Sequence, residues 1–505
     1  MARGLALLIA ALLVSCGASS SGSSSATDAS GSLSPLHAVR GTGAGIFDAQ
    51  SRQVILRGVN YGALGDYYLD NPANPAPVPA QPDDFAEMAA LGLNSIRLLV
   101  HWSKLEPQPG FIDSSYVAQI RAQIEQAAAH GIYVVVDMHQ DAWGKFVATR
   151  EAGQTCVPPL QPSLGWDGAP AWATLSGGLT TCHAEQREVA PAVAQAFTNF
   201  YLDTSGIRTQ FIQTWAALAA AVADEPNVAG YDLFNEPNPG YLVGVNGATA
   251  LALLYADLIT AIRGAEPTTP GGFAHIVFFE PSIEWSLLGY TPTPLPNFTN
   301  ETNLVFAPHN YCGSIGLVTP QDFCFQSSVQ VASTYGVTFW SGEWGCYDTP
   351  ENCLDHVVGF GQHEDATLTG SAMWQWAQAC GDPHSVGSPG GTPGAQIIQM
   401  KILGCPGDVD LGFDSTDAMV LSRAYPRAAP GHLTSISSDA QTAAFEVLGS
   451  TDAAGELDVW APERIGALQI DGDNLSDVRS ERVAGGYRIR ANVSGDYRLR
   501  ITPGN

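Results

Sequence analysis

Residues 231–240 read YDLFNEPNPG, and the interpretation of the whole chain starts from this stretch. The apolar, aromatic run Tyr231–Phe234 ends in Asn235-Glu236-Pro237, and a Gly/Pro turn follows. This pattern is typical of a buried strand that delivers polar side chains to the loop at its C-terminal end. Taken alone, it fits a catalytic carboxylate at Glu236 and equally well a glutamate that only caps the strand or pairs with a neighbour.

Short apolar runs alternate with helix-like segments around this stretch. Eight runs are strand-like: Val54–Asn60, Asn94–Val100, Ile132–His139, Val228–Asn235, His275–Glu280, Leu304–Tyr311, Val337–Trp344 and Ser371–Trp376. The helix-like segments include Asp83–Leu91, Tyr116–His130, Ile207–Ala223, Ala248–Arg263 and Gln321–Tyr335. Eight such units predict an α/β fold, a (β/α)₈ TIM barrel with a parallel sheet. A doubly wound open sheet is the alternative, but no Gly-rich phosphate loop follows the first strand.

The two ends of the chain differ from this pattern. Gly45–Asp48 is predicted to form a hairpin that leads into the first strand. From His432 to Thr502, short alternating runs are separated by Gly, Asn and Asp turns without helical periodicity. This predicts a C-terminal all-β sandwich over 429–505, behind a catalytic barrel over 37–428. A stabilising role is favoured for the sandwich over carbohydrate or membrane binding.

The N-terminus is predicted to be a targeting segment. Arg3 precedes an apolar run, Leu5–Val14, that is too short to span a bilayer. The run ends in Leu-Val-Ser-Cys16, and a Ser/Gly-rich tail follows. Residues 1–16 resemble a lipoprotein signal with a lipobox, and 17–36 resemble a linker. We expect an extracellular or cell-surface protein anchored through Cys16, with an ordinary secretory signal as the alternative. We expect no other stretch to span a membrane.

Eight cysteines remain after Cys16. An even number in an exported chain indicates disulfides. The simplest connectivity joins neighbours, namely 156–182, 312–324, 346–353 and 380–405, although the sequence alone leaves other pairings open. Zinc is disfavoured because no C-x-x-C pair is present.

Composition narrows the classes of partner. The chain has 505 residues, of which 45% are hydrophobic and 14% charged, as in globular proteins. A formal net charge of −27 argues against nucleic acid and against electrostatic attachment to anionic membranes. Sugars and uncharged glycolipids remain open as ligands.

Two connections are longer than a barrel needs. One lies between the third strand and Ile207 and carries Trp143, Phe146, Trp166 and Trp172; the other follows Trp376. Long βα loops lie on the catalytic face of such barrels, so both are expected to wall a cleft. Their aromatic rings can contact sugar or an apolar aglycone, or can pack the small cores of the loops themselves.

Polar residues cluster where the predicted strands end, which is where barrel chemistry takes place. They come from strands two, three, four, six, seven and eight: Arg97, Asp137, His139, Asp141, Asn235, Glu236, His309, Tyr311, Glu343 and Trp374. Each has an ordinary structural explanation by itself, but six strand ends on one face form a set.

This set resembles glycoside hydrolase family 5 over roughly residues 43–425. The resemblance implies Glu236 as acid/base and Glu343 as nucleophile, with Arg97, His139, Asn235, His309, Tyr311 and Trp374 as the remaining site residues. The stretch 137–141 is similar to that of endoglycoceramidases, which cleave the bond between an oligosaccharide and ceramide. The all-β C-terminal region is also similar to theirs, whereas residues 142–146 depart from their pattern.

The chemistry explains these residue types. Retaining hydrolysis needs two carboxyl groups about 5–5.5 Å apart. Strands four and seven lie across the ring from each other, so Glu236 and Glu343 can face each other. Arg97 and the Tyr311 hydroxyl are expected to stabilise the ionised nucleophile, and Asn235 to bind the sugar 2-hydroxyl. Glu236 is expected to lie where its anion is less favourable.

Other residues compete for these roles. Glu280 also ends a strand, but it lies on strand five, beside strand four and not across from it. Asp137 and Asp141 are expected to bind substrate hydroxyls or orient His139. A metal hydrolase is disfavoured because no H-E-x-x-H spacing occurs, and a serine hydrolase because no G-x-S-x-G elbow occurs.

The sequence therefore predicts an exported, retaining β-glycosidase of the endoglycoceramidase type that acts on carbohydrate or glycolipid. We expect a monomer without cofactor or metal, attached to a membrane only by its lipid anchor. An endo-β-glucanase, mannanase or β-glucosidase is the alternative. A non-catalytic glycan- or glycolipid-binding lipoprotein is the alternative from another class.

Overall fold

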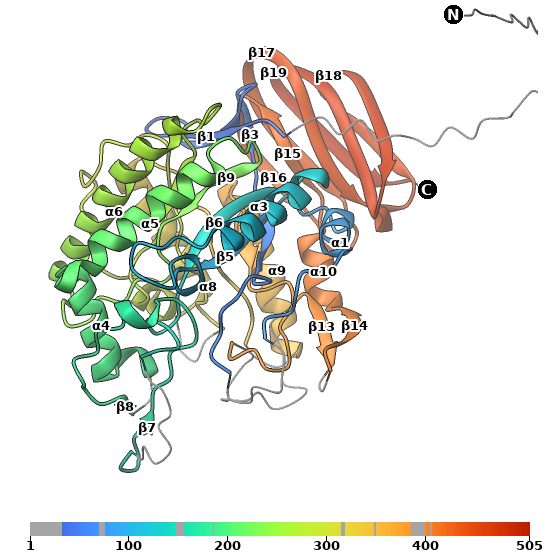
Figure 1. Ribbon diagram of the computed structural model, residues 1–505. Helices are drawn as coiled ribbons and strands as arrows, with labels where there is room; N and C mark the ends of the chain where they lie inside the picture. The colour runs from blue at the N-terminus through green and yellow to red at the C-terminus, as the bar shows by residue number, and fades with distance from the viewer. Residues whose placement is uncertain are drawn as a thin grey trace, which may run out of the picture. The chain divides into compact units, whose positions relative to one another are not determined.

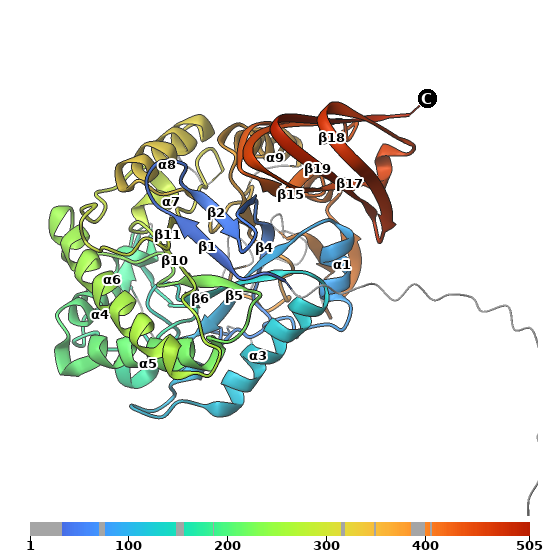
Figure 2. The same ribbon diagram turned by 90° about the horizontal axis from the view of Figure 1, so that it is seen from above.

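A parallel β-sheet surrounds the core of the larger part of the chain (Figures 1 and 2). The computed structural model describes residues 33–69, 76–147, 156–184, 186–314, 319–347, 350–384, 399–404 and 407–504. Seven strands pair in the order β11-β10-β9-β6-β5-β4-β12. Their bounds are β4 (Arg57–Tyr61), β5 (Ser95–His101), β6 (Tyr133–His139), β9 (Val228–Asp232), β10 (Ile276–Phe279), β11 (Leu304–Phe306) and β12 (Ser371–Met373).

The segment around Phe339–Glu343 closes this sheet. Parallel bridges join Phe306 to Phe339, His309 to Glu343, and Ser341 to Ser371, so the segment lies between β11 and β12. The (β/α)₈ barrel predicted from the sequence is confirmed. Its seventh strand is present as separate bridges and not as a continuous ladder.

Helices surround the strands (Figure 2). They are α1 (Asp84–Ala90), α3 (Ser114–Ala129), α5 (Ile207–Val222), α6 (Val245–Ala265), α8 (Gln321–Tyr335) and α9 (Pro350–Thr367), with the shorter α2 (Trp102–Leu105) and α7 (Glu284–Leu288) after β5 and β10. In α3 the Asp113 side chain caps the first turn, and Tyr116, Ile120, Ile124 and Ala127 form the buried face. The five predicted helices are present.

One helix departs from an expectation about membranes. Residues Val245–Thr268, which include α6, are long and apolar enough to cross a bilayer by length and composition. The expectation that no stretch past the N-terminus meets this criterion was therefore wrong. Leu254, Leu258 and Ile262 of α6 are fully buried in the barrel core, which accounts for the apolar composition.

The long connection after β6 contains its own elements, including the short strands β7 (Gln161–Pro162) and β8 (Cys182–His183) and the helix α4 (Pro191–Tyr201). Trp143 is buried in contact with Trp102 and Phe197, and Trp172 packs against Trp102. Trp143 is therefore a core residue, and the partly buried Trp172 packs against that core. Trp166 remains half-buried.

Three of the predicted disulfides are present: Cys156–Cys182, Cys312–Cys324 and Cys346–Cys353. Cys380 is also disulfide-bonded. Cys405, its predicted partner, lies outside the described residues, as does the whole N-terminal segment with Cys16.

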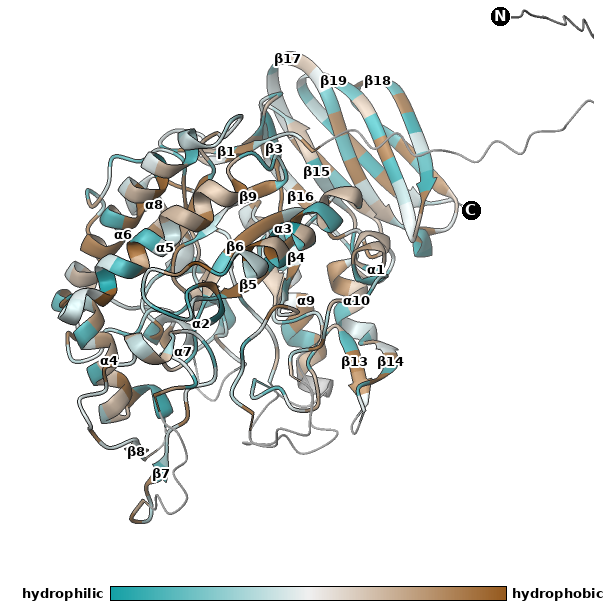
Figure 3. Ribbon diagram, in the orientation of Figure 1, coloured by the Kyte–Doolittle hydropathy of each residue, from teal (hydrophilic) through white to brown (hydrophobic). Residues whose placement is uncertain are grey.

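The C-terminal region forms an antiparallel β domain, as predicted, and the N-terminal strands join it. The strand path is β1-β2-β3-β15-β17-β19-β18, with β16 paired to β17. The bounds are β1 (Leu36–Val39), β2 (Gly45–Asp48), β3 (Arg52–Val54), β15 (Tyr425–Pro430), β16 (His432–Ser438), β17 (Phe445–Pro462), β18 (Leu468–Val483) and β19 (Gly486–Pro503). Figure 3 shows brown and teal alternating along the long strands, and Val447, Leu457, Leu499 and Ile501 are buried in this domain's core.

The β domain packs against the end of α1. Gly92 has φ +81°, and a Cβ placed there would lie 2.2 Å from the Trp460 indole nitrogen. The Tyr425 hydroxyl donates to the Gly92 carbonyl oxygen at 2.7 Å. Gly92 therefore provides both the left-handed turn and the close approach that this contact requires.

Candidate active site

Arg97 on β5 forms the buried centre of the predicted site. Its Nε lies 2.9 Å from Asp232, and its Nη1 lies 2.9 Å from Oε1 of Glu343. Its Nη2 lies 2.8 Å from Asn235 Oδ1 and 2.9 Å from both Glu280 and Asp137. Because the guanidinium is fully buried, its charge compensates carboxylates that would be costly to bury unpaired.

Glu343 is held at both carboxylate oxygens. Arg97 donates to Oε1, and the Tyr311 hydroxyl donates to Oε2 at 3.0 Å. These are the two contacts that the sequence predicted for an ionised nucleophile. A bidentate hold of this kind also fixes the direction in which the carboxylate points.

Glu236 faces Glu343 from the other side of the barrel. Oε1 of Glu236 accepts from the Ser286 hydroxyl at 2.5 Å and lies 3.0 Å from Nδ1 of His309. One oxygen of Glu236, one of Glu343 and a nitrogen of His309 all lie within 4.8 Å of one another. This spacing agrees with the short carboxyl separation of retaining glycosidases and is shorter than the roughly 6.5–9.5 Å of inverting ones.

The Glu236 backbone is itself positioned. Its φ is +40°, a left-handed value that is uncommon for a residue other than glycine. The Glu236 N–H donates to Oε2 of Glu280 at 2.8 Å, and Oε1 of Glu280 lies 3.2 Å from Nε2 of His309. Glu280 therefore orients the turn that carries Glu236, a role that the sequence did not predict for it.

The pKa values of the two facing carboxyls are shifted in opposite directions. Burial raises the pKa of Glu343 to about 7, against the opposing effects of His309 and Arg97. Burial also raises the pKa of Glu236, but the His309 and Ser286 hydrogen bonds outweigh it and the net shift is downward. The expectation that the Glu236 anion lies in a less favourable setting is therefore not met in this structure, because His309 and Ser286 both face that carboxylate. Two carboxyls this close hold one proton between them.

An aromatic floor lies beside the pair. The Trp374 and His139 rings stack at 5.4 Å with an interplanar angle of 17°, and Nδ1 of His139 is 2.7 Å from Asp137 Oδ2. Asp137 is fully buried, and its described contacts are with Arg97 and His139. The structure thus places Asp137 behind His139 as an orienting group.

Asn235 is engaged on both sides of its amide. Its Oδ1 accepts from Arg97, and its Nδ2 donates to the Gln140 carbonyl oxygen at 2.9 Å. The side-chain amide has a second N–H, which leaves one donor for a sugar hydroxyl. The predicted 2-hydroxyl contact stays a prediction.

Nine of the ten clustered strand-end residues, all except Asp141, are linked by these contacts, which also include Asn60, Asp232, Glu280 and Ser286. The Glu280-Pro281 pair repeats the Glu236-Pro237 pattern, which is the one sequence signal for Glu280. Ser286 lies on α7, and no motif marks it.

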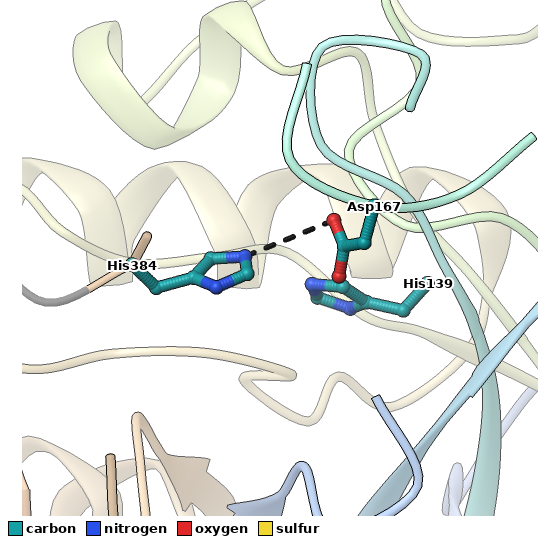
Figure 4. A group of neighbouring side chains, drawn as sticks. All are labelled: His139, Asp167 and His384. Carbon is teal, nitrogen blue, oxygen red and sulfur yellow. Dashed lines mark ion pairs between the residues drawn. The ribbon is translucent and has the colours of Figure 1, made fainter. Parts of the chain in front are cut away.

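Within the described residues, three clusters of side chains have metal-ligand spacing. Two of them, Asp232/Glu280/His309 and Glu236/His309/Glu343, overlap the groups described above. The third is His139/Asp167/His384, in which the two histidine rings lie on either side of the Asp167 carboxylate (Figure 4). His139 and Asp137 also belong to the hydrogen-bonded site, so this cluster is continuous with it.

Residues 48–379 match the family model described as cellulase, glycosyl hydrolase family 5. This match covers more than half of the chain. The chain belongs to glycosyl hydrolase family 5. The family 5 barrel is consistent with catalytic carboxylates at the ends of strands four and seven.

Several relatives of this family 5 chain have more specific names. It is 27% identical over 297 residues to endoglycoceramidase I of Rhodococcus hoagii, covering 55% of this chain and 54% of that protein. It is 29% identical over 231 residues to the endoglycoceramidase of Hydra vulgaris, covering 42% and 43%. The matched region thus spans about half the length of these curated relatives.

Solved structures extend the likeness beyond the barrel. A crystal structure of an endogalactoceramidase superposes with a TM-score of 0.85 at 41% identity, covering 94% of this chain and 100% of that chain. Endo-glycoceramidase II from Rhodococcus sp. superposes with a TM-score of 0.68 at 22% identity, covering 91% and 99%. The second likeness supports the fold, including the C-terminal β domain.

Proposed function

We propose that this family 5 chain is a retaining β-glycosidase that releases the sugar portion of glycolipids from ceramide. The observation that carries the proposal is the facing pair Glu236 and Glu343, whose carboxylates lie close together over a buried arginine. A protein that only binds glycans has no need for two such carboxyls. The non-catalytic alternative is therefore disfavoured.

The geometry suits double displacement. In the first step Glu343 attacks the anomeric carbon and forms a glycosyl ester, while Glu236 gives its proton to the departing oxygen. In the second step Glu236 takes a proton from water, and the resulting oxygen nucleophile replaces Glu343 with a second inversion. Entry of substrate at Glu236 is expected to compete with the Ser286 and His309 hydrogen bonds, which returns the proton to Glu236.

The glycolipid substrate rests on the relatives. The structure with 41% identity over 94% of this chain is of an endogalactoceramidase, and the curated relatives from Rhodococcus hoagii and Hydra vulgaris are endoglycoceramidases. Polysaccharide cleavage is the second candidate, since the matching family model is described as cellulase.

Export and anchoring are also part of the proposal. The apolar run that ends at Cys16, followed by a Ser/Gly-rich tail, supports a lipoprotein attached to the cell surface. Expression of Cys16→Ala in the native host tests this, because the anchored protein is expected in the membrane fraction and the variant in the soluble fraction. Equal partition of both forms contradicts it. We propose a monomer, which size-exclusion chromatography with light scattering tests.

A substrate panel tests the enzymatic proposal. Galactosylceramide, glucosylceramide and longer glycosylceramides are incubated beside cellulose and mannan oligosaccharides, with wild type, Glu236→Gln and Glu343→Gln. Release of ceramide by wild type alone is the expected result. Cleavage of polysaccharides only contradicts the glycolipid assignment, and equal rates for wild type and both variants contradict catalysis by this pair.

A further inference from the structure

His384 has no role in the chemistry described so far, although it lies beside the sugar platform. Its ring centroid is 4.9 Å from Tyr67, 4.8 Å from Trp166 and 5.3 Å from Trp374. It is buried, and its ring points toward the Asp167 carboxylate (Figure 4). Three aromatic rings thus fix one imidazole at the edge of the Trp374 platform.

Nδ1 of His384 is hydrogen-bonded, whereas Nε2 only faces carboxylates at ion-pair distance. Nδ1 lies 2.9 Å from Oδ1 of Asp382, which also accepts from the His384 backbone N–H. Nε2 has no hydrogen-bond partner, since it lies 3.5 Å from Asp141 Oδ2 and 3.8 Å from Asp167 Oδ1. A buried polar nitrogen without a partner is costly, so a ligand that supplies one gains affinity.

The charge around His384 makes this nitrogen a donor. Burial opposes protonation, but Asp167, Asp382 and Asp141 together raise the pKa of His384 to about 9. At neutral pH both ring nitrogens therefore carry hydrogen.

Asp141 supplies a fixed acceptor beside this donor. Its Oδ1 pairs with Arg187, whose guanidinium lies 3.1 Å from the centroid of the Trp166 ring. Its Oδ2 faces His384, with Nε2 3.5 Å away. Asp141 and Trp166 are both partly exposed, so this side of the pair is accessible to a ligand.

A hydroxyl group satisfies both partners at once. It accepts one hydrogen bond and donates another, and a single oxygen about 2.8 Å from each reaches two atoms that are 3.5 Å apart. We propose that His384 and Asp141 form a subsite that binds a hydroxyl of the sugar ring lying on Trp374, on the edge of the ring remote from the anomeric carbon. This inference rests on the proposed function, because it assumes a sugar ring on Trp374.

The remote edge is assigned from the side chains around the platform. In the proposed mechanism Glu343 and Glu236 act at the anomeric carbon, and Asn235 precedes Glu236 on the same turn. His139 stacks on Trp374, whereas the His384 ring lies 5.3 Å from Trp374 and 6.0 Å from His139 and has no described contact with Glu236, Glu343 or Asn235. The hydroxyls on C4 and C6 are therefore the expected ligands of the pair.

Deoxy sugars separate recognition from a structural role. We compare kcat/KM of wild type, His384→Ala and Asp141→Asn on a β-galactoside and on its 2-, 4- and 6-deoxy forms, with the exposed His130→Ala as control. The variants are expected to lose about tenfold or more on the parent sugar and on the 2-deoxy form. Against the 4- or 6-deoxy form they are expected to match wild type within about threefold.

An equal loss on all four sugars overturns the subsite. If His384→Ala fails to fold, Asp141→Asn, which changes the acceptor, decides the same ratio. If wild type hydrolyses none of these sugars, the affinities of the same compounds for Glu343→Gln, with and without Asp141→Asn, replace the rates. The subsite therefore fails or stands independently of the proposed hydrolysis.

Discussion

The Tyr311 hydroxyl offers a sharp test of how the nucleophile is held. Tyr311→Phe removes one hydrogen bond, 3.0 Å long, from Oε2 of Glu343 and leaves the ring in its buried position beside Leu99 and Trp374. A hydrogen bond to a charged group contributes about 1.5–3 kcal/mol. Since 1.36 kcal/mol corresponds to a tenfold change in rate, kcat/KM is expected to fall by about 10- to 150-fold.

The assay is steady-state hydrolysis of an aryl β-glycoside, with thermal unfolding to confirm the fold. The hydrogen bond stabilises the carboxylate form, so its loss raises the pKa of the pair and shifts the pH profile of kcat/KM to higher pH. Tyr231→Phe is the matched control, because it removes a buried hydroxyl on β9 whose described partner is His275, 3.1 Å away. Wild-type activity in a folded Tyr311→Phe protein would refute the reasoning.

Three further predictions concern the pair and the domain contact. The active pair holds one proton, and burial raises the pKa of Glu343 to about 7. A plot of kcat/KM against pH is therefore expected to be bell-shaped and to fall as pH rises through about 7. A profile that stays flat up to pH 9 contradicts this. Ser286→Ala removes a donor to Glu236 and so raises its pKa, which moves the alkaline limb to higher pH in the same measurement; an unchanged limb contradicts the contact. Gly92→Ala forces a Cβ against Trp460, whereas a Cβ at Gly131 would meet open space. Gly92→Ala is therefore expected to lower the free energy of unfolding by about 1–3 kcal/mol more than Gly131→Ala does. Equal denaturant midpoints for the two variants contradict this.

The sequence predicts the barrel well because its strands are buried on both faces. Apolar runs such as Asn94–Val100 therefore stand out, and their last residues mark the catalytic face. The helix α4 was not predicted, because it lies in a connection rich in Gly, Pro and Trp. Pairing of β3 with β15 joins residues more than 370 positions apart, and local pattern does not specify such a partner.

The residues of the candidate site also fall into a group that the sequence predicts and a group that it does not. Glu236, Glu343 and Arg97 lie on or directly after strands, so their convergence follows from the barrel topology. Ser286 and His384 lie on connections, and their positions depend on how those connections pack. The sequence marks Glu280 only as a rival catalyst, because its contacts with the Glu236 N–H and with His309 exist only in the folded turn.

Trapping the glycosyl-enzyme tests the central claim most directly. A 2-deoxy-2-fluoro β-glycoside with a good leaving group slows breakdown of the ester, and digestion with mass spectrometry locates the sugar. The account predicts one sugar per chain on the peptide that contains Glu343, and no labelling of Glu343→Gln. Labelling at Glu236 or Glu280, or hydrolysis with inversion and no covalent adduct, would contradict it.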